Sequence, residues 1–280
     1  YQIRVRINAS YGPGSAEWAA QNALRRLRSH GPPRFRALLA EGSGRYRDAA
    51  RLYGVALGER PGDVDLLADR GRTLFRSGNP EEAIRHLRMA IDQLRERDEN
   101  ELQPVYRSKA VLLHAIGLIQ EARTDWGAAR SAYSEALQED LAYWPAHVRL
   151  AEMALAVQDT LTAVSEMRLA AEIAPDEATA LLGYGRLLEA VGDLEEAERT
   201  FRHLTEIEPL FAAPYGRLAR VLDRRNRSAA AAAAYRAFVD RAHAEEEGLA
   251  EAEERLRELD ASPTSGGSRN SDLVMQFLSR

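Results

Sequence analysis

A period of 34 residues runs along this chain and limits it to a repeat architecture. Two stretches show the period most clearly: residues 78–83 read GNPEEA and residues 192–197 read GDLEEA. They lie 114 residues apart, which is three periods plus an insertion of 12 residues at 98–109. A 34-residue ruler then divides the chain into six units: 30–63, 64–97, 110–143, 144–177, 178–211 and 212–245.

Each unit carries the same side-chain sizes at the same places. The eighth place is always Ala or Gly, and the twenty-fourth is always large and apolar or aromatic. Small residues let two helices cross closely, and a large residue fills the space beside neighbouring pairs. The pattern therefore predicts two helices and a short turn in every unit, stacked because one pair cannot bury its apolar face alone. The eighth places are Ala37, Gly71, Gly117, Ala151, Gly185 and Ala219, and the twenty-fourth are Tyr53, Leu87, Tyr133, Met167, Phe201 and Tyr235.

On these residues the chain resembles the tetratricopeptide repeat (TPR) family, whose repeat has about 34 residues. The resemblance covers residues 30–245 and is strongest in units two and five. Unit one departs from it at Pro33 and Arg36, and unit six has Asn226 where a Gly often stands. The resemblance implies an all-α, right-handed superhelical solenoid of antiparallel helix pairs.

The residues before the repeats predict two elements. In the arm 1–14, Ile3, Val5 and Ile7 alternate with polar residues, which indicates a strand-like segment. A lone strand is not stable in water, so this one would pair with a segment outside the chain or be loose. Residues 15–29 follow with an N-cap serine and an apolar stripe, which predicts an N-terminal capping helix.

Three segments follow the repeats. Residues 246–260 predict a polar C-terminal capping helix, and 261–271 have the composition of a flexible linker. The tail 272–280 is apolar again and is interpreted as a peptide that docks on its own solenoid or on a partner, or as a frayed end. Its candidate assembly residues are Leu273, Met275, Phe277 and Leu278.

Composition and charge exclude several classes of protein. The net charge of -5 argues against a polybasic nucleic-acid binder, and no apolar run is long enough to predict a membrane span. The absence of cysteine excludes disulfides, thiolate metal sites and cysteine nucleophiles. Charge is uneven, since residues 1–60 hold 11 Arg and 4 acidic residues, and this asymmetry would favour head-to-tail contacts between copies or steer a partner.

No motif for catalysis, metal or cofactor binding is present. The six histidines show no metal-ligand spacing, and the chain has no dinucleotide fingerprint, phosphate-binding loop or nucleophile elbow. Paired glutamates such as Glu81 and Glu82 stand at predicted helix starts, where the helix dipole accounts for them. The sequence thus predicts a protein that is not an enzyme and needs no cofactor.

The resemblance also implies a site, since TPR proteins bind partners in a concave groove lined by first-helix places two, five, nine, twelve and thirteen. The pairs Arg72 with Arg76 and Arg220 with Arg224 would suit carboxylate or phosphate groups on a partner, unless neighbouring acidic residues neutralise them. The carboxylate clamp of chaperone-binding TPR domains is not expected, because its places hold other residues. The predicted groove residues are Arg72, Arg76, Leu118, Glu152, Arg186, Arg220 and Arg224.

Three functions remain open. The first is a scaffold or adaptor that holds a peptide or protein partner in the groove, within a larger assembly. The second is a structural subunit that polymerises through its terminal segments, and the third is the regulatory arm of a larger enzyme. The start at Tyr1 slightly favours an exported protein over other locations, although a chain cut from a longer protein explains it equally well.

Overall fold

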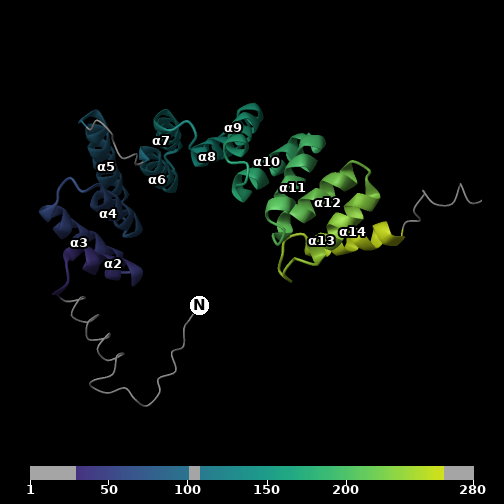
Figure 1. Ribbon diagram of the computed structural model, residues 1–280, viewed down its shortest axis with the longest axis horizontal. Coiled ribbons are helices and arrows are strands. Elements are labelled where there is room, and N and C mark those ends of the chain that lie inside the picture. Colours follow the sequence, from purple (N-terminus) through teal and green to yellow (C-terminus); the bar gives the residue numbers. More distant parts are fainter. Residues whose placement is uncertain (1–29, 101–107, 262–280) are drawn as a thin grey trace, which may run out of the picture. The chain divides into compact units, whose positions relative to one another are not determined.

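The computed structural model describes residues 30–100 and 108–261, which form thirteen helices and no strand (Figure 1). This confirms the predicted all-α architecture. The arm 1–14, the capping helix 15–29, the tail 272–280 and all but the first residue of the linker lie outside the described residues. The helices are α2 (Pro33–Gly42), α3 (Tyr46–Glu59), α4 (Val64–Arg76), α5 (Pro80–Asn100), α6 (Lys109–Ala122), α7 (Trp126–Glu139), α8 (Trp144–Ala156), α9 (Thr160–Ile173), α10 (Ala178–Val191), α11 (Leu194–Ile207), α12 (Ala212–Arg224), α13 (Ser228–Val239) and α14 (Leu249–Ala261).

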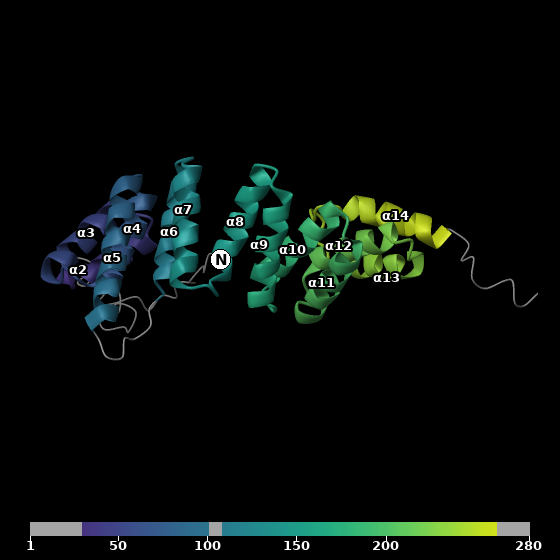
Figure 2. The same ribbon diagram turned by 90° about the horizontal axis from the view of Figure 1, so that it is seen from above.

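The chain divides into two compact units, 1–146 and 147–280, with the boundary inside α8. In the first unit the pairs α2/α3, α4/α5 and α6/α7 each pack as a hairpin, and α3 contacts α4 while α5 contacts α6. In the second unit α10/α11 and α12/α13 pair in the same way, and α14 packs on α13 (Figure 2). His147 of α8 joins α9, because its Nδ1 lies 2.6 Å from Oε2 of Glu166.

The helices differ from the repeat ruler mainly at the insertion. Helix α5 continues to Asn100, three residues into the segment 98–109, and α6 begins at Lys109, the last residue of that segment. Lys109 Nζ of α6 forms ion pairs here with Asp98 of α5 and with Glu139 at the end of α7, which tie the three helices together. At the other end, Ala261 belongs to α14 rather than to the linker.

All six hairpin turns place a left-handed residue at the fifteenth place of the repeat. Glycine occupies it in three units, where φ is 73° to 90°. In the other three units Thr124, Gln158 and Asn226 adopt φ of 58° to 61°, a region that costs a residue with a Cβ about 1–2 kcal/mol. The turn geometry is therefore set by the stacking of the two helices, which overrides the preference of the residue itself. The glycines are Gly44, Gly78 and Gly192.

The sixteenth place starts the second helix of the pair. In three units it is an aspartate whose carboxylate accepts a hydrogen bond from the backbone N–H three residues on, and this satisfies one of the free donors of the helix. Helices α3, α9 and α11 end two residues before Pro61, Pro175 and Pro209, as the sequence predicts. The N-cap residues are Asp125, Asp159 and Asp193.

In the three hairpins with glycine at the eighth place, the large residue at the twenty-fourth place packs directly against that glycine. All six large residues at the twenty-fourth place are buried, with exposed fractions of 5% or less. A Cβ added to Gly117 would stand 2.3 Å from Cε1 of Tyr133, and one added to Gly185 would stand 2.5 Å from Cε1 of Phe201. The ring therefore takes the volume that a side chain at the eighth place would need, and glycine there is a packing requirement.

Candidate partner-binding groove

Acidic residues at the twelfth place link successive first helices. Glu41 lies near the C-terminal end of α2 and accepts a hydrogen bond at 2.9 Å from Nε of Arg72 on α4. Glu189 of α10 lies 3.3 Å from Nη1 of Arg217 on α12, and Asp223 of α12 accepts a bond at 2.7 Å from Nε of Arg255 on α14. The residues of the first-helix face are therefore joined from repeat to repeat by charge-assisted bonds.

Arg72 is the centre of a partly buried network in the first unit. Its Nη2 also lies 2.9 Å from Oδ1 of Asp69, and Tyr53 donates its hydroxyl to Oε2 of Glu41 at 3.2 Å. The hydrogen bond to Glu41 raises the pKa of the Arg72 guanidinium, while burial raises the pKa of the Asp69 carboxyl. Arg72 thus already holds two carboxylates and is less available to a partner than the sequence alone suggests.

Arg76 has a different environment. Its guanidinium lies 5.3 Å from the centre of the Tyr46 ring and its Nη1 contacts the Tyr46 hydroxyl at 3.5 Å. No ion pair joins Arg76 to another described residue, so its charge is held by an aromatic face rather than neutralised. Arg72 and Arg76 therefore do not act as a matched pair, although they are four residues apart on one helix.

In the second unit the predicted residues Arg220 and Arg224 converge on Glu189. Nε of Arg220 lies 3.7 Å from the Glu189 carboxylate, and Arg224 donates to the Glu189 backbone carbonyl at 2.9 Å. Glu152 is paired within its own helix, at 2.6 Å from Nη1 of Arg149. Arg186 is exposed, and no described residue forms an ion pair or hydrogen bond with its guanidinium.

Several large apolar side chains remain exposed at groove places of the first helices. Leu38 and Leu118 occupy ninth places and are 46% and 41% exposed, and Val111 at a second place is 50% exposed. Phe75 and Leu155 occupy the twelfth places of the second and fourth repeats, the two repeats in which that place is not acidic. The first-helix face is thus a mixture of apolar side chains and arginines, most of the latter paired.

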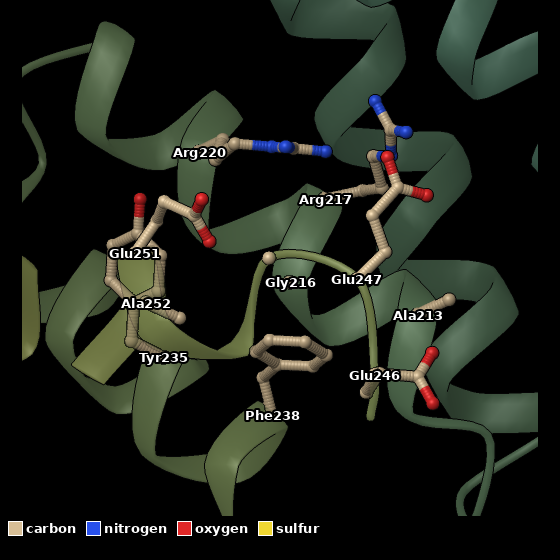
Figure 3. A pocket seen from close by; sticks show the side chains of 11 residues that line it. Ala213, Gly216, Arg217, Arg220, Tyr235, Phe238, Glu246, Glu247, Glu251 and Ala252 are labelled. Carbon is tan, nitrogen blue, oxygen red and sulfur yellow. The ribbon is translucent and has the colours of Figure 1, made fainter. Parts of the chain in front are cut away.

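A pocket of about 310 Å³ opens in the second unit, between α12, α13 and the segment that leads into α14 (Figure 3). Its inner surface is formed by the buried rings of Tyr235 and Phe238, next to Gly216. Ala213, Gly216 and Arg220 are places two, five and nine of the sixth repeat, so this pocket lies on the predicted groove face. The remaining lining residues are Arg217, Glu246, Glu247, Gly248, Glu251 and Ala252.

The glutamates of this pocket are functional candidates that the sequence analysis assigned only to a polar cap. The sequence also offered a signal that was not used: the twelfth place of the repeat is acidic in four of the six repeats, at Glu41, Glu121, Glu189 and Asp223. In residues 30–100 and 108–261 no group of His, Asp and Glu is arranged to hold a metal ion. Nor does any helix in these ranges have the length and hydropathy to cross a membrane.

Comparison with known families identifies the repeat. Residues 40–103 and 178–209 each match a tetratricopeptide repeat profile, and each match contains the helix pair described above. The chain is a TPR protein. The two matched stretches include the second and fifth repeats, whose pattern is strongest. The six hairpins extend that pattern through the described residues.

Solved TPR structures share the fold at low sequence identity. The C-terminal part of a TPR repeat-containing protein from Cytophaga hutchinsonii superposes with a TM-score of 0.57 at 10% identity, over 81% of this chain and 95% of that one. YrrB, described as a TPR protein with an unusual peptide-binding site, has a TM-score of 0.53 at 17% identity, over 74% of this chain and all of its own.

A curated relative shares one segment. The cellulose synthase operon protein C of Pseudomonas fluorescens is 32% identical over 95 residues, which are 34% of this chain. The match spans only 7% of that protein's length.

Proposed function

We propose that this TPR chain is a non-catalytic scaffold that holds a peptide or protein segment against its first-helix groove within a larger assembly. The TPR fold is a protein-interaction fold, and the observation that carries the proposal is the set of large apolar side chains left exposed at groove places. Three successive first helices of the first compact unit carry Leu38, Phe75, Val111 and Leu118. Burial of these side chains against a partner would gain hydrophobic free energy.

The arginines of the groove add polar recognition to this surface. In the first compact unit Arg76 is held only by the Tyr46 ring, and in the second Arg186 has no described partner, so each can form an ion pair with a carboxylate bound to its own unit. Arg72, Arg220 and Arg224 contribute mainly by fixing one repeat against the next. YrrB, which shares the fold and is described as having a peptide-binding site, supports peptide binding as a use of this fold.

Site-specific photo-crosslinking in the source cells tests the proposal. A photoreactive residue at Leu118 or Arg186 should give a discrete adduct with a partner, because both side chains are exposed on first helices. Matched positions on second helices, Arg130 and Arg168, are exposed as well and should give none. Equal adducts at the two sets of positions, or no adduct at Leu118 and Arg186, would refute groove binding.

Self-assembly through the terminal segments is the alternative that must be separated from this. Size-exclusion chromatography of the full chain, with light scattering on the eluate, gives its mass in solution. A mass of 31.1 kDa at all concentrations supports the scaffold. A mass that grows with concentration, and that falls when residues 1–10 are deleted, supports the structural subunit instead.

A further inference from the structure

The pocket between α12, α13 and α14 has an excess of negative charge. Arg217 and Arg220 on α12 both lie close to Glu189, so one carboxylate already compensates part of their charge. Glu246, Glu247 and Glu251 line the other side, from the segment before α14 and from α14 itself. Four carboxylates therefore face two guanidinium groups, and the site carries a net charge of about -2 at neutral pH.

The three glutamates of the α14 side are available to a ligand. No described residue forms a hydrogen bond or an ion pair with their carboxylates, whereas Asp223 and Glu189 nearby are both paired with arginine. Gly248, with φ of 81°, turns the chain into α14 and fixes the segment that carries Glu246 and Glu247 beside the pocket. Unpaired carboxylates at the edge of a cavity favour a cationic group within it.

The inner surface suits a long side chain with an apolar stem. Phe238 is 3% exposed and borders the pocket beside Gly216, where an added Cβ would stand 3.3 Å from its ring (Figure 3). Tyr235 and Ala252 complete an apolar base. A volume of about 310 Å³ is at the lower end for ligand pockets, so it fits one side chain or two rather than a large cofactor.

We propose that this pocket receives an arginine side chain from an extended segment of a partner protein. The guanidinium would lie between the carboxylates of Glu247 and Glu251, and its methylene stem would lie along Gly216 beside the Phe238 ring. Arginine is favoured over lysine because a planar guanidinium bonds carboxylates in a bidentate way and stacks on aromatic faces. The proposal rests on the groove function above and names the chemistry of one contact within it.

A peptide titration on the ¹⁵N-labelled full chain tests the contact. The probe is acetyl-Gly-Ser-Arg-Ser-Gly-amide, and two matched probes carry citrulline or glutamate in place of arginine. Citrulline keeps the shape of arginine and removes its charge. The backbone amide signals of Gly216 and Gly248 report binding, since both residues line the pocket. We expect saturable shifts with a Kd on the order of 1 mM for the arginine peptide, about fivefold weaker binding of citrulline and none of glutamate.

Protein variants separate the pocket from general acidity. The double variant Glu247→Gln with Glu251→Gln should weaken the arginine peptide by about fivefold or more, because it removes the unpaired charges. Glu254→Gln removes another exposed carboxylate of α14, one that does not line the pocket, and it should change the affinity by less than about twofold. The variant Gly216→Val should abolish the shift at Gly248, because its side chain would fill the part of the pocket beside the Phe238 ring.

Four results would overturn the proposal: equal binding of arginine and citrulline peptides, stronger binding of the glutamate peptide, an equal loss in Glu254→Gln, or shifts that depend on protein concentration without peptide. The last would identify a second copy of this chain as the occupant. A chain that crosslinks a partner through Leu118 and Arg186 but ignores the arginine peptide refutes this contact alone. A chain that fails the crosslinking refutes the groove function, whatever the peptide does.

Discussion

Replacing Gly185 by alanine tests the close packing of a glycine at the eighth place against the large residue at the twenty-fourth place. In a helix this change normally stabilises, by about 1 kcal/mol, because alanine has the higher helix propensity. Here the new Cβ would stand 2.5 Å from Cε1 and 2.8 Å from Cζ of Phe201, whereas ordinary van der Waals contacts begin near 3.4 Å. Phe201 has an exposed fraction of 0%, so its ring cannot move away without displacing other core residues.

The two effects have opposite signs, and their sizes decide the outcome. Overpacking a well-packed core costs about 1–3 kcal/mol, and a displacement of nearly 1 Å against a fully buried ring belongs at the upper end. Subtracting the propensity gain leaves a net loss of about 2 kcal/mol in the free energy of unfolding. Gly58→Ala on α3 is the matched control, because nothing lies within 4 Å of its Cβ position, and it should gain about 0.5–1 kcal/mol.

Urea unfolding followed by far-UV circular dichroism measures both variants, and hydrogen exchange in α10 and α11 localises the effect. A second substitution makes the test sharper. Phe201→Met combined with Gly185→Ala recreates the Ala151 and Met167 pair of the fourth repeat, so the double variant should recover about 1–2 kcal/mol relative to additivity. The reasoning is refuted if Gly185→Ala stabilises as Gly58→Ala does, or if the two substitutions are additive.

Three further predictions concern turns, caps and pH. Thr124→Gly should stabilise by about 0.5–1 kcal/mol, because φ of 61° is strained for a β-branched residue; a lowered melting temperature would contradict this. Asp193→Ala should cost about 1 kcal/mol by removing the cap on Glu196 N–H, and an unchanged urea midpoint would refute it. Burial raises the pKa of the Glu198 carboxyl, but hydrogen bonds from Arg202 and Arg227 outweigh it, so the folded pKa lies below the usual 4.5. The stability from this depressed pKa is therefore present at neutral pH and is lost as pH falls through and below that value. Glu198→Gln should lower stability at pH 7 and flatten the acid limb of the pH profile measured by thermal unfolding; an unchanged limb would refute it.

The helices and turns of this chain can be predicted from the sequence because the interactions that form them lie within one helix pair. The 34-residue period, the small eighth place, the prolines and the glycines of the turns act within one helix pair, and the structure places a helix pair on each predicted unit. The sequence even located the departures: Pro33, out of pattern for the first repeat, stands as the first residue of α2, where its fixed φ suits a helix start.

Two local features, the backbone conformation of the non-glycine turns and the helix ends at the insertion, depend on tertiary packing rather than on the residue at each position. Thr124 and Gln158 adopt the left-handed conformation that three other turns assign to glycine, because the crossing of the two helices requires it. Helix α5 continues three residues into the predicted insertion, and α6 starts at its last residue. The ion pairs of Lys109 with Asp98 and Glu139 hold this junction, and they depend on a distance that no spacing along the chain specifies.

The spacing of residue types along the chain is enough to predict the repeat, the helix pairs and the set of first-helix residues from which a groove can be built. Which of their charges are free depends on the distances between elements in the folded chain. Arg72 and Arg220 are paired with acids from the preceding repeat, while Arg186 and the glutamates beside α14 are not. The pocket on Phe238 likewise depends on α14 packing where a seventh first helix would stand, and a charge is neutralised or available according to such distances between elements rather than according to composition.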